Sequence, residues 1–360
     1  MSQVPKIVTA VSSHAIYLER VAAKFGNDVI PYLERIRRKM NTILNNAGNL
    51  SNIDVRREVI ADINKVTREE LQEYTTQYKL NNKELAVQDA KFNAKTLESI
   101  IPAYEAVIPS AAAINKIAIG TPVNVGGGLF NTYNKYVDTY WKTYADKIDS
   151  AVKTGFQAGQ TNQQISSAIL DQFDTVDKQA RSAAKTMART GTNHYSTSTT
   201  RAFVEANEDV IPRYRFIATL DNLTSRQCGS LDGQAFETDS DNIPFPPLHP
   251  NCRSRMGYDV DGRSSFDDNQ STRPSNFKVD DKRDPKRINS QSVYYDELGK
   301  LSAADQDAIL GNNLGKAFRK MSPDDFAKQT INSTYEPLTI AEMKKKDNEL
   351  GKILRKQEKT

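Results

Sequence analysis

Apolar residues recur at helical spacing through the first part of the chain. Four of them follow one another at intervals of four, three and four positions: Val29, Leu33, Ile36 and Met40. This spacing places them on one face of a helix, and residues 59–66 repeat it. Such a stripe most often forms intramolecular core, and its alternative use is docking onto a larger helical partner. The pattern predicts a mostly helical N-terminal region over residues 1–154.

A second helical stretch follows residue 160. Thr161 and Gln164 form a capping box ahead of an apolar run, so that their side chains can bond backbone N–H groups of the first helical turn. A separate, longer helix is expected over about 176–207. Earlier in the chain, the three glycines at 126–128 lack the lysine and the hydroxyl residue of a phosphate loop, which favours a hinge between helical blocks.

The period then changes to that of strands. RYRFIATL (213–220) alternates and is rich in aromatic and β-branched residues. LDGQAFE (231–237) places a turn-forming Asp-Gly pair beside a short apolar run, and RMGYDV (255–260) follows a proline-rich stretch. Together these segments predict a small central α+β domain over residues 155–262 with a short antiparallel sheet.

The rest of the chain divides into a polar and a helical part. Residues 263–291 carry charges of both signs and almost no apolar side chains, which is typical of an extended linker. Residues 292–360 predict a small helical C-terminal module. Ser302 and Ser322 are expected N-caps there, and Pro323 suits a first helical position. The fold class predicted for the whole chain is α+β.

Composition narrows the classes of protein. Of the 360 residues, 38% are hydrophobic, and the formal net charge of +4 permits contact with nucleic acid without arguing for it. Two cysteines rule out a disulfide framework and fit a reducing compartment. The N-terminus lacks the apolar core of a signal peptide, and no run of about 18 apolar residues occurs. We therefore expect a protein that is made and kept in the cytosol, or in something assembled there, and that does not enter a membrane.

The scarcest reactive side chains gather in a stiff segment. Residues 244–254, PFPPLHPNCRS, hold four prolines together with His249 and Cys252, and proline restricts the backbone around itself. With Cys228, these residues offer two sulfur donors and one nitrogen donor, which are ligands that zinc accepts in a tetrahedral site. The candidates for a fourth ligand are Asp221, Asp232 and His194.

Other readings of the same residues stay open. The cysteines can be small buried apolar side chains, with His249 hydrogen-bonded to a backbone carbonyl. A catalytic reading would make Cys252 a nucleophile with His249 or His194 as its base. A proline-locked segment is a poor place for a mobile base, so we assign no catalytic and no cofactor-binding residue. A structural zinc ion is the one cofactor considered.

A polar patch lies late in the long helix. Arg189, Thr190 and Asn193 stand in MARTGTNHYSTSTT, where serines and threonines in series weaken a helix interior. These side chains should therefore have tertiary partners. We expect hydrogen bonds from Arg189 to the neighbouring hairpin in preference to ligand binding.

These segments together resemble a known family. ART (188–190), DNLTSRQCGSLDGQAF (221–236) and PPLHPNCRS (246–254) are similar in order and spacing to the Mu F-like minor head proteins of tailed bacteriophages, also called the phage head morphogenesis domain. The likeness covers roughly residues 155–262, and residues 292–343 resemble a C-terminal extension found on many members. The residues that carry the structural motif are Arg189, Thr190, Leu231, Asp232, Gly233, Pro247, Pro250, Asn251 and Arg253.

The chain departs from this family at two positions. Many members have cysteines where this chain has Ser225 and Ser254. The paired loss suggests that those two cysteines act together, in a metal site or in a disulfide. A four-cysteine zinc site is therefore excluded here, while a weaker site at the remaining donors and a purely structural loop both stay open.

The resemblance implies a structural minor head protein, not an enzyme. Such a protein lies in the interior of the virion head near the portal and acts in head assembly, DNA packaging or DNA ejection. Its expected partners are the portal protein, the scaffolding and major capsid proteins, and packaged double-stranded DNA bound without sequence specificity. Because the N-terminal helices carry the most amphipathic surface, we expect them to dock on the portal.

Two alternative functions remain. Some family members carry a C-terminal effector enzyme, a nucleotidyl or ADP-ribosyl transferase or a nuclease, delivered with the genome. Residues 292–360 have no histidine, no cysteine and no glycine-rich phosphate loop, which weighs against that reading. The other alternative is a non-specific binder of packaged DNA, whose affinity would fall steeply with added salt.

Overall fold

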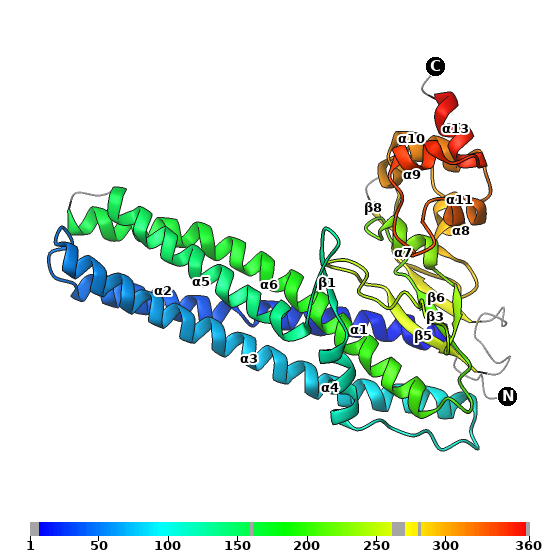
Figure 1. Cartoon of the computed structure of the whole chain (residues 1–360), viewed down its shortest axis with the longest axis horizontal. Coiled ribbons are helices and arrows are strands. Elements are labelled where there is room, and N and C mark those ends of the chain that lie inside the picture. The colour runs from blue at the N-terminus through cyan, green and yellow to red at the C-terminus, as the bar shows by residue number, and fades with distance from the viewer. Residues whose placement is uncertain (1–6, 159–160, 261–270, 280–281, 358–360) are drawn as a thin grey trace.

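The computed structural model describes residues 7–158, 161–260, 271–279 and 282–357. A long helical bundle projects from a smaller region that contains a sheet, and a helical module packs on that region (Figure 1). The helices of the first part are α1 (Ile7–Asn27), α2 (Ile30–Asn46), α3 (Ile53–Ile100), α4 (Ala111–Gly120), α5 (Tyr133–Ala158) and α6 (Asn162–Ala206). At a rise of 1.5 Å per residue, the 48 residues of α3 span about 72 Å.

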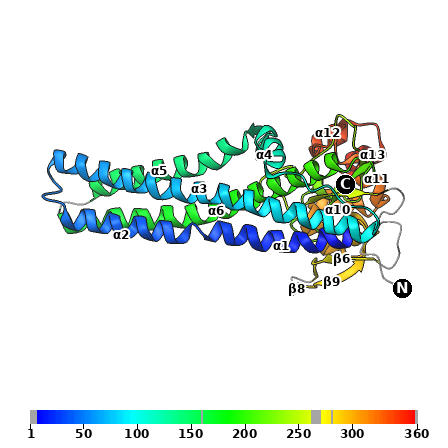
Figure 2. The same cartoon turned by 90° about the horizontal axis from the view of Figure 1, so that it is seen from below.

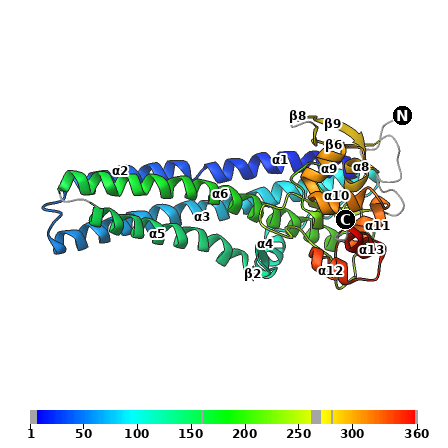
Figure 3. The ribbon, with the colours of Figure 1, turned by 90° about the horizontal axis from the view of Figure 1, so that it is seen from above.

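The bundle buries the apolar stripe that the sequence predicted. α1 and α2 follow one another along its length, and α3 runs back beside them (Figures 2 and 3). Four side chains of the stripe have no exposed surface at all: Val29, Leu33, Ile36 and Met40. The helical N-terminal part is confirmed, and its stripe forms intramolecular core.

Residues 162–206 form one helix, not the two that the sequence suggested. The capping box of Thr161 and Gln164 starts it, as expected. The helix continues because its buried positions keep step along a single face: Ile165, Ile169, Phe173, Val176, Ala180, Ala184 and Met187. α6 therefore runs from the far end of the bundle into the sheet region (Figure 1).

The expected division between residues 1–154 and 155–262 falls inside this bundle. Residue 154 lies within α5, and α6 packs against α1, α2, α3 and α5. At Gly155, a Cβ atom would come within 2.7 Å of the Ile169 Cα atom, so that only glycine permits this approach of α5 to α6. The two segments share one packed core.

The central sheet is antiparallel and has three strands in the order β4 (Ala235–Glu237), β3 (Arg213–Ile217) and β5 (Arg255–Asp259). Tyr214 of β3 pairs with Phe236 on one side and Tyr258 on the other. α1 and α6 pack against β5. The predicted short antiparallel sheet is confirmed, and with the helices it gives the predicted α+β class.

The glycines at 126–128 form the turn of a hairpin where a hinge was expected. β1 (Val123–Gly126) and β2 (Leu129–Asn131) pair antiparallel. The three glycines have φ angles of 97°, 61° and 73°, a backbone that glycine adopts without strain. The hairpin lies close to α4 (Figures 1 and 3).

The described part of residues 263–291 is paired β-structure, so the expectation of an extended linker is wrong there. The strands are β6 (Thr272–Ser275) with β9 (Lys286–Asn289), and β7 (Lys278–Val279) with β8 (Lys282–Arg283). The polar composition suggested a linker, but backbone pairing between the strands and a buried ion pair hold this segment in place. Arg273 lies 3.0 Å from Asp232 in that pair. Residues 263–270, 280 and 281 lie outside the described residues.

The C-terminal segment is helical over its described residues, as predicted. Its helices are α8 (Tyr294–Gly299), α9 (Ala303–Leu310), α10 (Asn312–Phe318), α11 (Pro323–Gln329), α12 (Ile340–Lys345) and α13 (Glu349–Gln357). Ser302 and Ser322 cap α9 and α11, and Pro323 lies in the first turn of α11. None of the helices in the described part of the chain combines the length and apolarity that a membrane span needs.

Candidate functional site

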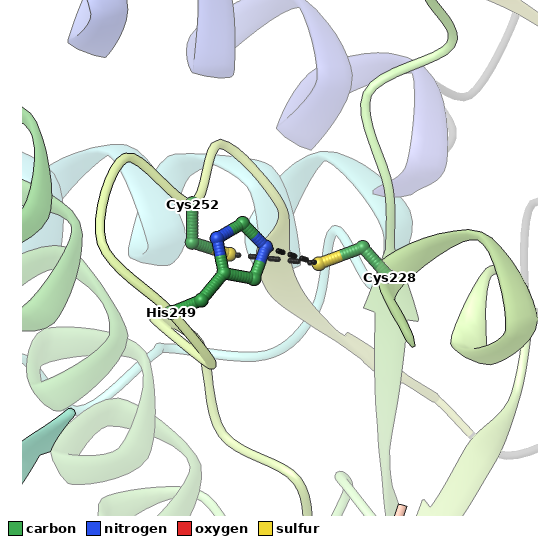
Figure 4. Close-up of side chains that lie close together, drawn as sticks. All are labelled: Cys228, His249 and Cys252. Carbon is green, nitrogen blue, oxygen red and sulfur yellow. Dashed lines mark hydrogen bonds between the residues drawn. The ribbon is translucent and has the colours of Figure 1, made fainter. Parts of the chain in front are cut away.

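Three side chains able to ligate a metal meet in the core beneath the central sheet (Figure 4). The Sγ atom of Cys228 lies 3.4 Å from His249 Nε2 and 3.7 Å from Cys252 Sγ. All three donor atoms lie within 4.8 Å of one another. Both cysteines are buried, and His249 is partly exposed. The structure brings together the three residues that the sequence nominated.

Cys228 is positioned by a short helix, α7 (Arg226–Leu231). The Oγ atom of Ser225 accepts a hydrogen bond from the backbone N–H of Cys228 at 3.2 Å, which makes Ser225 the N-cap. An N-cap stands three positions before the residue whose N–H it accepts, and this is the spacing in TSRQC. The cap therefore fixes where the Cys228 thiol enters the site.

His249 and Cys252 belong to the proline loop, residues 244–254. Its Pro246–Pro247 peptide bond is cis, and Asn251 has a left-handed backbone with φ of 62°. The backbone N–H of Cys252 donates to the carbonyl of His249 at 3.1 Å. This closed turn directs the imidazole and the thiol toward the Cys228 side chain (Figure 4).

The polar patch of α6 anchors the proline loop. Thr190 Oγ1 accepts from the Asn251 N–H at 2.9 Å, and Arg189 donates to Asn251 Oδ1 at 3.0 Å. The amide of Asn193 donates to the carbonyls of Cys252 at 2.8 Å and of Ser254 at 3.1 Å. Arg189 thus bonds the proline loop instead of the expected hairpin. Its patch satisfies loop backbone groups that would otherwise be buried without partners.

The pKa values of the three side chains are shifted in different directions. The hydrogen bond with Cys228, and then the neighbouring His249, hold the pKa of the Cys252 thiol well below its usual value despite burial. The same bond, with burial, raises the pKa of Cys228. Burial alone would lower the pKa of His249, but the bond and the charge of Cys252 outweigh it and raise that pKa. These shifts favour loss of a proton at Cys252 and retention of the proton at Cys228 and His249.

The residues expected to supply a fourth ligand are all held elsewhere. Asp221 Oδ1 accepts from Arg253 at 2.8 Å, and His194 Nε2 lies 2.7 Å from the carbonyl of Ala118. Asp232 is the partner of the buried Arg273. Among the described residues, the cluster of possible ligands contains only Cys228, His249 and Cys252. The expectation of a fourth ligand from Asp221, Asp232 or His194 is therefore wrong for this conformation.

Two serines, Ser225 and Ser254, also lie at this site. The sequence analysis considered them only as positions where a cysteine is missing. The side chains of Ser225 and Ser254 both hydrogen-bond Cys228, which opposes the rise of its pKa. They are the two positions at which the sequence departs from the pattern of the family it resembles. Two hydroxyl groups thus lie beside the two thiols and the imidazole. This set of donors fits a zinc ion with two sulfur ligands, one nitrogen ligand and a hydroxyl or water oxygen.

The other residues of the motif have structural roles around this site. Leu231 is buried, and Gly233 needs its glycine because its φ is 82°. Asp232 accepts from the backbone N–H groups of Ala218 and Tyr294, each at 2.8 Å. Pro250 packs near the β1–β2 hairpin at Gly126. Each of these contacts joins two elements that lie apart in the sequence.

Comparison with known proteins gives a family match, and it covers the part of the chain that holds this site. Residues 146–256 match the model of the family described as phage Mu protein F like protein. That range contains α6, α7, β3, β4, the proline loop and the first two residues of β5. No curated protein and no solved structure matches the chain. Residues 146–256 are therefore similar to the phage Mu F-like family that the sequence motifs indicated.

Proposed function

We propose that this chain is an architectural minor protein of the phage head, held in the head interior at the portal, where it acts in head assembly, DNA packaging or DNA ejection. The family match supports a role in head morphogenesis. The observation that carries the architectural role is the use of the motif side chains. Arg189, Thr190 and Asn193 each form a hydrogen bond with the proline loop. This use favours a structural role, in which these side chains hold the loop against α6.

The contact with the portal is proposed to lie on the segment 107–130. Half of the exposed large apolar side chains in the described chain belong to it: Val107, Ile108, Ile119, Leu129 and Phe130. Exposed apolar side chains that cluster are typical of protein–protein contact sites. The buried stripe at Val29 and Met40 is used within the bundle, so it is not available for docking. The proposal therefore keeps the N-terminal half as the docking region and moves the contact to α4 and the hairpin.

Co-purification of the full chain with the portal protein of the same phage tests this proposal. The double variant Leu129→Ser, Phe130→Ser should reduce recovery by about tenfold, because two exposed anchors lose roughly 1–3 kcal/mol of contact energy. Leu223→Ser is the matched control, since Leu223 is 80% exposed but lies outside the segment. Undiminished recovery of the double variant would refute the docking surface.

A second measurement tests the architectural role itself. Mass spectrometry of purified phage particles should find the chain in the head, and the purified chain should turn over neither NAD nor RNA. Absence from particles, or turnover of either substrate, would favour the effector-enzyme reading.

We further propose that Cys228, His249 and Cys252 hold a structural zinc ion. Support comes from their donor types, their mutual distances and the burial of both cysteines. When bound, the ion would tie α7 to the proline loop. The oxygen at the fourth position would come from Ser225, Ser254 or water.

A further inference from the structure

A broad cleft lies between α1, the end of β3 and the strands that follow the central sheet. Its volume is about 900 Å³. Ser12 and Arg20 of α1 line one side, and residues 217–221 line another. The opposing wall is built by residues 273–276 and by Arg283, Pro285, Lys286 and Arg287 of the β6–β9 region. Figures 2 and 3 show these strands beside α1.

The lining of this cleft is strongly cationic, although the whole chain carries a formal charge of only +4. Seven cationic side chains line it, against the two anionic ones of Glu19 and Asp221. The seven are Arg20, Arg189, Arg253, Arg273, Arg283, Lys286 and Arg287. The cleft therefore gathers positive charge locally.

Four of the seven cations have an acidic partner, because Arg273 also pairs with Asp232 and Lys286 with Asp284. Glu19 accepts from Arg189 at 2.9 Å and from Arg255 at 3.3 Å, and Asp221 is bonded to Arg253. The exposed side chains of Arg20 and Arg283 form no ion pair with any of the described residues. Arg287 is also exposed and donates only to Thr272 at 2.8 and 2.9 Å. These three arginines thus carry positive charge at the cleft without an acidic partner among the described residues.

A second feature of the cleft also fits an anion with several oxygen atoms. Within the part of the chain that the structure describes, the hydroxyl groups of Ser12 and Ser275 have no hydrogen-bond partner, and these residues are 7% and 3% exposed. Buried hydroxyls are almost always paired in folded proteins. Both serines line the cleft, so an acceptor placed there could satisfy them.

We propose that this cleft binds phosphate groups, either of a nucleic-acid backbone or of a free oligophosphate. Six of its seven cations are arginines, whose planar fork matches phosphate oxygens through paired hydrogen bonds. An acidic polypeptide would also match the positive charge of the cleft. Each of its carboxylates, however, has fewer acceptor oxygens than a phosphate group to offer to the hydroxyls of Ser12 and Ser275. The proposal stands on the cleft alone and goes beyond the architectural role proposed above.

Fluorescence anisotropy with the full chain tests the site. The probes are a labelled duplex DNA of mixed sequence, inorganic triphosphate as competitor and polyglutamate as a second competitor. The test variant is Arg20→Gln, Arg283→Gln, Arg287→Gln, all at exposed positions. The control variant removes three charges outside the cleft, Lys65→Gln, Lys83→Gln, Lys95→Gln, which are exposed on α3.

The unchanged chain should bind the duplex with an affinity that falls steeply as salt is added. The cleft variant should bind about tenfold more weakly with a shallower salt dependence, while the control stays within about twofold. Displacement by triphosphate identifies a free phosphate as a sufficient ligand. Binding of triphosphate alone would still support the site and assign it to oligophosphates. Equal binding by both variants, or displacement by polyglutamate but not by triphosphate, would overturn the proposal.

Discussion

At the scale of single residues, the three donors of the proline-loop site differ in how far water reaches them. Cys228 is 2% exposed and Cys252 is not exposed at all, while His249 keeps part of its ring at the surface. A thiolate formed there would need a positive partner, because water cannot solvate it. A protonated His249 would supply one such partner, and a bound zinc ion would supply a stronger one.

Metal content gives the first prediction at this scale. Elemental analysis of the purified chain should find about one zinc ion per molecule, and Cys252→Ser should lose it because a thiolate ligand is removed. The double variant Ser225→Cys, Ser254→Cys should hold zinc more tightly against a chelator, since it adds thiolates where hydroxyls now contact Cys228. No zinc in either the unchanged chain or the double variant would leave a packed loop without metal.

At the scale of elements, the sequence predicted what depends on neighbours along the chain. The buried stripes, the Thr161 cap and the three segments of the central sheet follow from local spacing, and the structure confirms them. The sequence did not predict the strands around Arg273, because the ion pair that holds them involves a carboxylate 41 positions away. The meeting of Cys228 with the proline loop was foreseen from residue types, whereas the serines beside it were noticed only as departures.

The contact of α4 with α6 depends on one buried histidine and gives a pH-dependent prediction. Burial lowers the pKa of His194 to about 4 from its ordinary 6.5, although its bond to the Ala118 carbonyl opposes this. Between these two pH values the unfolded chain binds a proton that the folded chain does not. The free energy of unfolding should therefore fall as pH falls from 6.5 to 4, by up to about 3 kcal/mol from this group.

His194→Gln isolates that contribution, since glutamine keeps an N–H donor for Ala118 but does not titrate. Urea unfolding at a series of pH values should show a smaller loss of stability in the variant across this range. An identical loss in both proteins would mean that the histidine does not govern the acid response.

At the scale of the whole molecule, a buried carboxylate joins three parts of the chain. Asp232 follows α7, accepts from Ala218 after β3 and from Tyr294 at the start of α8, and pairs with Arg273 of β6. Burial raises the pKa of this carboxyl, and the charge of Arg273 opposes that rise. The sheet region, the β6–β9 strands and the C-terminal helices thus meet at one side chain.

Asp232→Asn should lower the free energy of unfolding by about 3–5 kcal/mol, because it leaves the Arg273 guanidinium buried without a counter-charge. The double variant Asp232→Asn, Arg273→Met should recover much of that loss in urea unfolding. Asp324→Asn is the matched control: it breaks the exposed pair with Lys328 and should leave the free energy of unfolding nearly unchanged. A single variant no less stable than this control would show that the pair contributes little.

The enclosure of both sulfur atoms has a practical consequence for mapping the molecule's neighbours. The chain has only two cysteines, and neither presents its thiol to solvent. A cysteine introduced by Leu129→Cys at the hairpin tip would then be the single thiol that a maleimide dye or a cross-linker can reach. Whatever that reagent joins to the hairpin inside an assembled particle would be identified without first removing any native residue.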